Sequence, residues 1–300
     1  MCGRYAVTTD PAKLAAEIDA INEVPVPLDP SSDKPGSDKP GRDKPGRDKP
    51  GRDKPGRDNP GRDIAGSGDD DGGSRTEKDT ADGTPRSPGP NYNVAPTTTV
   101  MTVVRRHSHD HPDDDPALRI RAMRWGLVPP WAKEIGKGPL LFNARAESAA
   151  EKSSFRTSVK SKRCLVPMDG WYEWKKGPND DKGKPTKVPF FMSPHDGTRL
   201  FMAGLWSVWR PKDAPKDADP LLSCSILTTD AVGHLREVHD RMPLVMPYDN
   251  WDAWLDPDHT APGELFSPPT EAVADAIDIR EVAPLVNRVA NNGPELLEPV

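Results

Sequence analysis

A charged pentapeptide repeat is the feature that most constrains this chain, because the repeat has almost nothing to bury. From residue 33 the chain reads DKPGS, then DKPGR four times, then DNPGR. Proline and glycine keep such units out of helices and sheets, and charges of both signs stay solvated. We therefore expect residues 29–89 to form a disordered low-complexity insertion.

The rest of the sequence is typical of a folded domain. Outside the insertion about two-fifths of the residues are apolar, which is an ordinary share for a globular core. We expect a single domain made of residues 2–28 and 90–300. The sequence shows neither a long apolar run nor a basic segment followed by one. These observations predict a cytoplasmic protein without a membrane partner, and we separately expect a monomer.

Charge and cysteine content narrow the classes of partner. The net charge of −6 argues against sequence-blind coating of nucleic acid, although a local basic groove is compatible with it. Cys2, Cys164 and Cys224 are too few and too widely spaced for a disulfide framework or a zinc site. His107, His109 and His111 alternate in an acidic loop and give no closed ligand set. We expect neither a metal nor another cofactor.

Short strands dominate the pattern of elements. CGRYAVTT is typical of a strand, and DPAKLAAEIDAI of a helix with Asp10 as its N-cap and Pro11 in first position. Further strands are predicted in NYNVAPTTTVMTVV, ALRIRAMRWGLVP, RCLVPMDGWYEWKK, VPFFMS, RLFMAGLWSVW and LLSCSILTTDA, and helices near ESAAEKSSFRTSV and NWDAWLDP. This pattern predicts an α+β fold with a curled, β-rich mixed sheet or barrel-like core flanked by short helices.

Cys2 offers the most distinctive chemistry. Because the side chain after Met1 is small, we expect Met1 to be removed and the mature chain to begin at Cys2. A thiol and an α-amine then share one carbon skeleton, and both free amine and thiolate are expected near neutral pH. Such an aminothiol condenses with an aldehyde through nitrogen and closes through sulfur to a thiazolidine. The alternative is an incidental terminal cysteine.

Eight segments carry a resemblance to a known family. They are MCGRYA at the start, YNVAPT at 92–97, RWGLVPPWA at 124–132, FNARAES at 142–148, RCLVPMDGWYEWKK at 163–176, FMAGLW at 201–206, HDRMPLVM at 239–246 and VANNGPELLEP at 289–299. In this order they resemble the SRAP family of abasic-site processing proteins. The resemblance covers all of the chain except the insertion.

The resemblance implies a reaction and its residues. Cys2 would crosslink to the ring-opened aldehyde of an abasic site in single-stranded or junction DNA. Asn143 would hydrogen-bond the linkage, and Glu173 and His239 would transfer protons. The chemistry needs such groups, because sugar opening and carbinolamine dehydration require an acid and a base. His239 titrates near neutral pH, and the aromatic neighbours of Glu173 are expected to raise its pKa.

Each of these residues also has a simpler interpretation. Glu173 fits the solvent-facing position of an alternating strand, His239 fits a surface ion-pair cluster, and Asn143 fits a turn. These alternatives stay open at the level of the sequence.

Arginine and tryptophan side chains are the candidates for DNA contacts. The resemblance implies that Arg4 and Arg145 hold phosphates, and Arg156 is a further candidate because guanidinium groups bind phosphate in bidentate fashion. Trp125 and Trp131 flank the GLVPP turn and are predicted to stack on bases. A core role for one or both tryptophans is the alternative.

Two other functions compete with crosslinking. N-terminal-nucleophile amidohydrolases often open with a similar MCG segment, but the Gly-rich strand and the HRG-type and NGE-type segments expected of them are missing here. A non-catalytic single-strand DNA-binding module is the other alternative. The sequence favours a crosslinking protein with lyase-type and peptidase activity.

Overall fold

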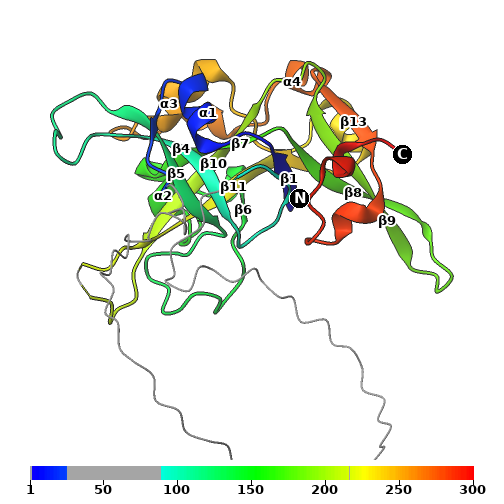
Figure 1. Ribbon diagram of the computed structural model, residues 1–300, viewed down its shortest axis with the longest axis horizontal. Helices are drawn as coiled ribbons and strands as arrows, with labels where there is room; N and C mark the ends of the chain where they lie inside the picture. The colour runs from blue at the N-terminus through cyan, green and yellow to red at the C-terminus, as the bar shows by residue number, and fades with distance from the viewer. Residues whose placement is uncertain (1, 26–88, 216) are drawn as a thin grey trace, which may run out of the picture. The chain divides into compact units, whose positions relative to one another are not determined.

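The computed structural model describes residues 2–25, 89–215 and 217–300 (Figure 1). The predicted disordered insertion, residues 29–89, lies outside the described residues except for its last position, and so stays a prediction.

Two sheets form the framework of the described chain. The five-stranded sheet has the order β13-β9-β8-β1-β3. Its strands are β13 (Ile277–Glu281), β9 (Pro185–Pro194), β8 (Gly170–Asn179), β1 (Arg4–Val7) and β3 (Asn91–Val94). The second sheet has the order β12-β11-β10-β7-β4-β5-β2, with β6 paired to β11. Its strands are β12 (Arg241–Pro243), β11 (Leu221–Asp230), β10 (Leu200–Trp209), β7 (Arg163–Met168), β4 (Thr99–Arg106), β5 (Ala117–Trp125), β2 (Ile21–Asn22) and β6 (Asn143–Arg145).

The second sheet closes on itself. β5 pairs with β11 in parallel, so β11, β10, β7, β4 and β5 form a ring. The apolar runs of these strands fill the ring, and all six residues of β7 are buried. The predicted α+β fold with a barrel-like core is confirmed.

Short helices surround the sheets. They are α1 (Pro11–Glu17), α2 (Arg156–Ser161), α3 (Trp251–Leu255) and α4 (Glu271–Asp275), with 3₁₀ turns η1 (Ala146–Ser148), η2 (Gly233–Glu237), η3 (Tyr248–Asn250), η4 (Gly263–Phe266), η5 (Pro284–Asn287) and η6 (Pro294–Leu297). The predicted N-cap is confirmed, since Asp10 accepts hydrogen bonds from the backbone of Ala12 and Lys13, each at 2.9 Å. None of the helices in the described ranges is long and apolar enough to cross a bilayer.

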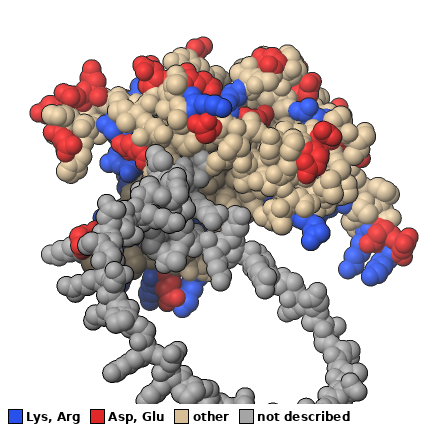
Figure 2. Space-filling view, in the orientation of Figure 1, with Lys and Arg blue, Asp and Glu red and all other residues tan. Residues whose placement is uncertain are grey.

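Strand alternation separates two apolar clusters. On β8, Trp171 packs into the main cluster, whereas Tyr172 packs into a second, smaller one with Ala6, Phe191 and Val286. The second cluster joins the C-terminal segment to the five-stranded sheet. Charges of both signs are spread over the face drawn in Figure 2, and acidic side chains gather on the turn between β4 and β5.

Candidate active site

Four segments converge around Cys2. Arg4 of β1 lies opposite Tyr172 of β8, so the start of β1 runs beside Glu173. β6 begins at Asn143, which lies opposite Ile226 of β11. β12 pairs with the same end of β11, and His239 comes two residues before β12.

Asn143 holds the backbone of Cys2. Its Nδ2 donates a hydrogen bond to the carbonyl oxygen of Cys2 at 2.6 Å. Its Oδ1 is buried and has no hydrogen-bond partner among the described residues. Asn143 is therefore not a plain turn residue: it lies on a strand, fixes Cys2 and keeps an acceptor inside the site.

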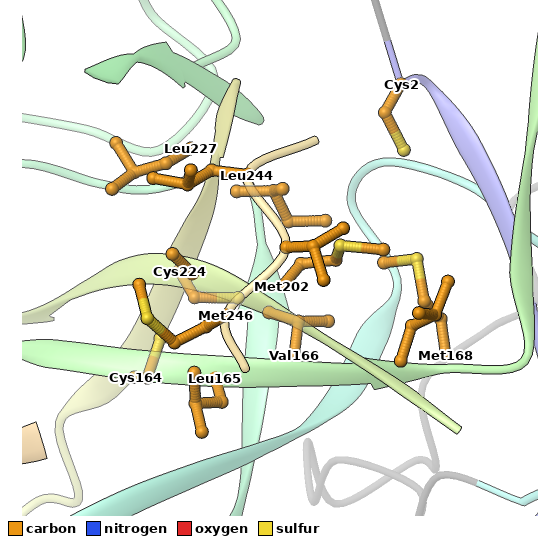
Figure 3. Packing of buried hydrophobic residues seen from close by; sticks show 14 of the residues in the cluster. Cys2, Cys164, Leu165, Val166, Met168, Met202, Cys224, Leu227, Leu244 and Met246 are labelled. Atoms are coloured by element: carbon orange, nitrogen blue, oxygen red, sulfur yellow. The ribbon is translucent and has the colours of Figure 1, made fainter. Parts of the chain in front are cut away.

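Cys2 itself is fully buried, at 0% exposure. Its Sγ lies 3.9 Å from the carbonyl oxygen of Arg4. Figure 3 shows its side chain at the margin of the main apolar cluster, apart from Cys164 and Cys224. Burial raises the pKa of the Cys2 thiol far above its usual range, and the charge of Glu173 raises it further. Burial thus disfavours the thiolate of Cys2 while Met1 precedes it, and the thiolate fraction expected for a chain that begins at Cys2 stays a prediction.

Glu173 is a buried carboxyl group on β8, with 2% exposure. Its side chain points to the face of the strand opposite to Tyr172 and therefore to the same face as Trp171, which belongs to the main cluster. Burial raises the pKa of Glu173 to about 7, and the charge of Asp240 adds to this effect. The predicted rise in pKa is confirmed, and the alternative of a solvent-facing glutamate is wrong.

His239 is partly exposed and makes two contacts through Nδ1. The backbone N–H of Arg241 donates to Nδ1 at 3.0 Å, and Oδ1 of Asp240 lies 2.8 Å from the same nitrogen. Burial lowers the pKa of His239, so the ring is mainly neutral at neutral pH. With Arg241 donating to Nδ1, the neutral ring carries its proton on Nε2. The alternative of a surface ion-pair cluster is thus limited to the exposed Asp240, whose contact with His239 is an ion pair only when the ring is protonated.

The three candidate phosphate ligands differ in their surroundings. Nη1 of Arg4 donates to Oδ1 of Asn93 at 2.7 Å and to the carbonyl oxygen of Val286 at 2.9 Å, so Arg4 also anchors the C-terminal segment. Arg145 is exposed and lies two residues from Asn143, on the same side of β6. Arg156 is exposed at the start of α2, and no contact in the described ranges ties it to the residues around Cys2.

The two tryptophans near the GLVPP turn have opposite environments. Trp125 is fully buried, donates from Nε1 to the carbonyl oxygen of Phe142 at 2.9 Å and meets the ring of Tyr5 edge-on. The predicted stacking of bases on Trp125 is therefore wrong, and the core alternative holds, because no face of this ring reaches solvent. Trp131 is 63% exposed, and its stacking role stays a prediction.

Comparisons with known proteins show which fold and family the chain shares. A solved protein of Bacteroides thetaiotaomicron has a similar fold, with a TM-score of 0.56 and 23% identity over 70% of this chain and 85% of its own. The model of the family "SOS response associated peptidase (SRAP)" matches residues 62–289. The chain belongs to the SRAP family. The resemblance inferred from the eight segments is confirmed.

Two relatives illustrate the breadth of the SRAP family. The abasic site processing protein YoqW of Bacillus subtilis (strain 168) is 38% identical over 209 residues, covering 70% of this chain and 86% of YoqW. The abasic site processing protein HMCES of Pongo abelii is 34% identical over 241 residues, covering 70% of this chain and 65% of HMCES. The SRAP match includes Asn143, Glu173 and His239, whereas Cys2 precedes the matched range.

Sequence reasoning missed an ion pair close to Asn143 and His239. Arg241 and Glu147 form a bidentate pair, with both N–O distances 2.9 Å. The two residues lie in the FNARAES and HDRMPLVM segments, but the sequence gives no signal that pairs positions 94 residues apart. The alternating histidines have other contacts: His107 bonds the carbonyl oxygen of Asp114 and the carboxylate of Asp258. Within the described ranges, no cluster of histidine, cysteine and acidic residues is arranged to hold a metal ion.

Proposed function

We propose that this SRAP-family chain processes abasic sites in single-stranded or junction DNA by forming a covalent thiazolidine crosslink through Cys2, which shields the lesion from strand cleavage. The observation that carries the proposal is the hydrogen bond from Asn143 to the carbonyl of Cys2, beside a buried carboxyl group whose pKa is about 7. The relatives named as abasic site processing proteins support the same substrate.

The proposed reaction begins with hydrolysis of the Met1–Cys2 peptide bond, which frees the α-amine of Cys2. The amine adds to the aldehyde carbon of the ring-opened deoxyribose and gives a carbinolamine. Protonation of its hydroxyl group releases water and leaves an imine. The thiol then adds to the imine carbon, its proton passes to the nitrogen, and the five-membered ring closes with the net loss of one water.

The surroundings of Cys2 favour this order of events. Because burial keeps the thiol neutral, nitrogen attacks first and sulfur reacts only once an electrophilic imine lies beside it. A carboxyl group with a pKa of about 7 is well suited to give and accept protons at neutral pH, and this is the role we assign to Glu173. His239 complements it as a neutral donor through Nε2–H. An imine that sulfur does not trap undergoes β-elimination, so weak lyase activity accompanies crosslinking.

Binding of the DNA strand relies on phosphate contacts and stacking. Arg145 extends from the strand that carries Asn143, and Arg4 and Arg156 are the other proposed phosphate ligands. Trp131 presents an exposed ring on which a base can stack, a contact worth roughly 1–3 kcal/mol per base. We expect a monomer whose affinity falls with salt and depends little on base sequence.

Intact-mass measurement tests the proposal directly. The purified chain is incubated with a uracil-containing oligonucleotide that uracil glycosylase has converted to an abasic strand. We expect a chain that lacks Met1 and a single adduct with the mass of chain plus DNA minus water. Cys2→Ala, which can form only a short-lived imine, should give no adduct that survives heating, and Cys224→Ala is the matched control that should form the heat-stable adduct normally. Tight binding without any adduct supports a DNA-binding module instead, and glutamine hydrolysis without DNA supports an amidohydrolase.

A further inference from the structure

The guanidinium group of Arg241 is engaged by several partners although it lies next to the site. The side chain is 11% exposed. Nη1 and Nη2 contact Oε1 and Oε2 of Glu147 at 2.9 Å each. Nη1 also donates to Oδ1 of Asp230 at 2.6 Å, and Nη2 donates to the carbonyl oxygen of Thr228 at 2.7 Å. Both terminal nitrogens are therefore used within the protein.

These partners belong to the segments that carry the site. Glu147 lies in η1, directly after the strand that begins at Asn143. Thr228 and Asp230 end β11, the strand on which both β6 and β12 are paired. A bidentate pair with a planar guanidinium fixes distance and orientation together. Arg241 thus fastens the segment of Asn143 to the segment of His239.

The backbone of Arg241 acts on His239 at the same time. Its N–H donates to Nδ1 at 3.0 Å, and Asp240 competes for that nitrogen. Nδ1 cannot serve both partners in the same state: it accepts from Arg241 when unprotonated and donates to Asp240 when protonated. The position of residue 241 therefore decides which ring nitrogen carries the proton of the neutral histidine.

We propose that Arg241 is a positioning residue for His239: by bridging Glu147 and Asp230 it holds its own N–H on Nδ1 and keeps the ring proton on Nε2. The expected effect on the rate of crosslinking rests on the proposed function. The expected tautomer of the His239 ring is independent of that function, because it can be measured in the protein without DNA.

Arg241→Lys tests the proposal with a residue that keeps the charge but cannot form the bidentate pair. Glu147→Gln is the second variant, since it weakens the same bridge from the other side. Glu151→Gln is the matched control, because Glu151 is exposed four residues after Glu147 and pairs with no cation in the described ranges. Nitrogen-15 NMR of the imidazole ring reports the tautomer in each free protein. Single-turnover crosslinking over a range of abasic oligonucleotide concentrations gives the saturating rate and the half-saturating concentration.

We expect Arg241→Lys to raise the Nδ1–H population of His239 and to lower the saturating rate by at most roughly tenfold, the effect expected for loss of the ring itself, with little change in the half-saturating concentration. Glu147→Gln should change both readouts in the same direction by a smaller factor, and Glu151→Gln should match the wild type. A wild-type tautomer and saturating rate in Arg241→Lys, combined with weaker and less salt-dependent binding, would overturn the proposal in favour of a phosphate ligand. If Arg241→Lys fails to fold, the tautomer and rate of Glu147→Gln decide. If the wild-type chain forms no adduct, the proposed function fails, and the NMR measurement still decides the role of Arg241.

Discussion

Cys2 and the pair Cys164 and Cys224 are alike in their burial and differ in their polar neighbours. All three thiols are fully buried, and burial raises the pKa of each, that of Cys224 to about 12. Cys164 and Cys224 lie on barrel strands within the apolar cluster, where a Cβ atom at Gly204 would come within 2.9 Å of the sulfur of Cys164. Cys2 instead has a carboxyl group and an amide beside it. Burial and pKa therefore do not distinguish Cys2 from the other two thiols, whereas the carboxyl and amide groups beside it do.

Cys2→Ser gives the largest effect expected from this comparison. A hydroxyl group is a weaker nucleophile toward an imine than sulfur, so the heat-stable crosslink should disappear and strand cleavage or a short-lived imine should replace it. Denaturing gels after heating measure both products. Cys224→Ala, which removes an equally buried sulfur, should crosslink like the wild type. A heat-stable adduct of unchanged yield in Cys2→Ser would rule out the thiazolidine.

Glu173→Gln removes the titrating neighbour and keeps the shape of the side chain. We expect the rate of crosslinking to fall by roughly a hundredfold or more, because general acid–base catalysis is lost. Rapid-quench measurements at saturating abasic DNA give this rate. A wild-type rate in the variant would mean that proximity to Cys2 is not enough to assign a catalytic role.

The pH dependence of the free energy of unfolding tests the raised pKa of Glu173 without DNA. The pKa of Glu173 rises from 4.5 to about 7 on folding. Between these values the folded chain binds more protons than the unfolded chain, so the stabilisation present below pH 4.5 is lost as the pH rises toward 7. This loss is on the order of 3 kcal/mol. Urea unfolding at pH 5 and pH 8 should show a smaller difference for Glu173→Gln than for the wild type or Glu151→Gln, and equal differences would contradict the raised pKa.

His239→Ala should have the smallest of these effects. The ring is partly exposed, so water can replace part of its proton transfer, and we expect formation and reversal of the crosslink to slow by roughly tenfold. Both rates are measured on the same adduct, reversal by dilution into excess unlabelled abasic DNA. Rates equal to those of the wild type in both directions would remove His239 from the mechanism.

Patterns local in sequence predicted much of the fold. The long strands of the barrel follow from apolar runs with β-branched and aromatic residues, and the start of α1 follows from Asp10 and Pro11. β6 and β12 escaped prediction, because three residues are too short for a period to show. They form only because β11 offers an edge on each side.

The sequence predicted which residue types form the candidate site better than it predicted their protonation and burial. Motif positions pointed to Asn143, Glu173 and His239, and the aromatic flank of Glu173 indicated its raised pKa. The neutral thiol of Cys2 and the core position of Trp125 depend on what packs around them in three dimensions. The same is true of the Glu147–Arg241 pair, whose partners meet only when β6 and β12 join β11.

The complete burial of Cys2 has a consequence for the durability of an aminothiol in a cell. Oxidants and small metabolic aldehydes consume accessible thiols, and thiolates most readily. A sulfur with no exposed surface and a raised pKa is protected from both. Under the proposed function, selectivity then depends on which ligands gain access to this sulfur rather than on its intrinsic reactivity.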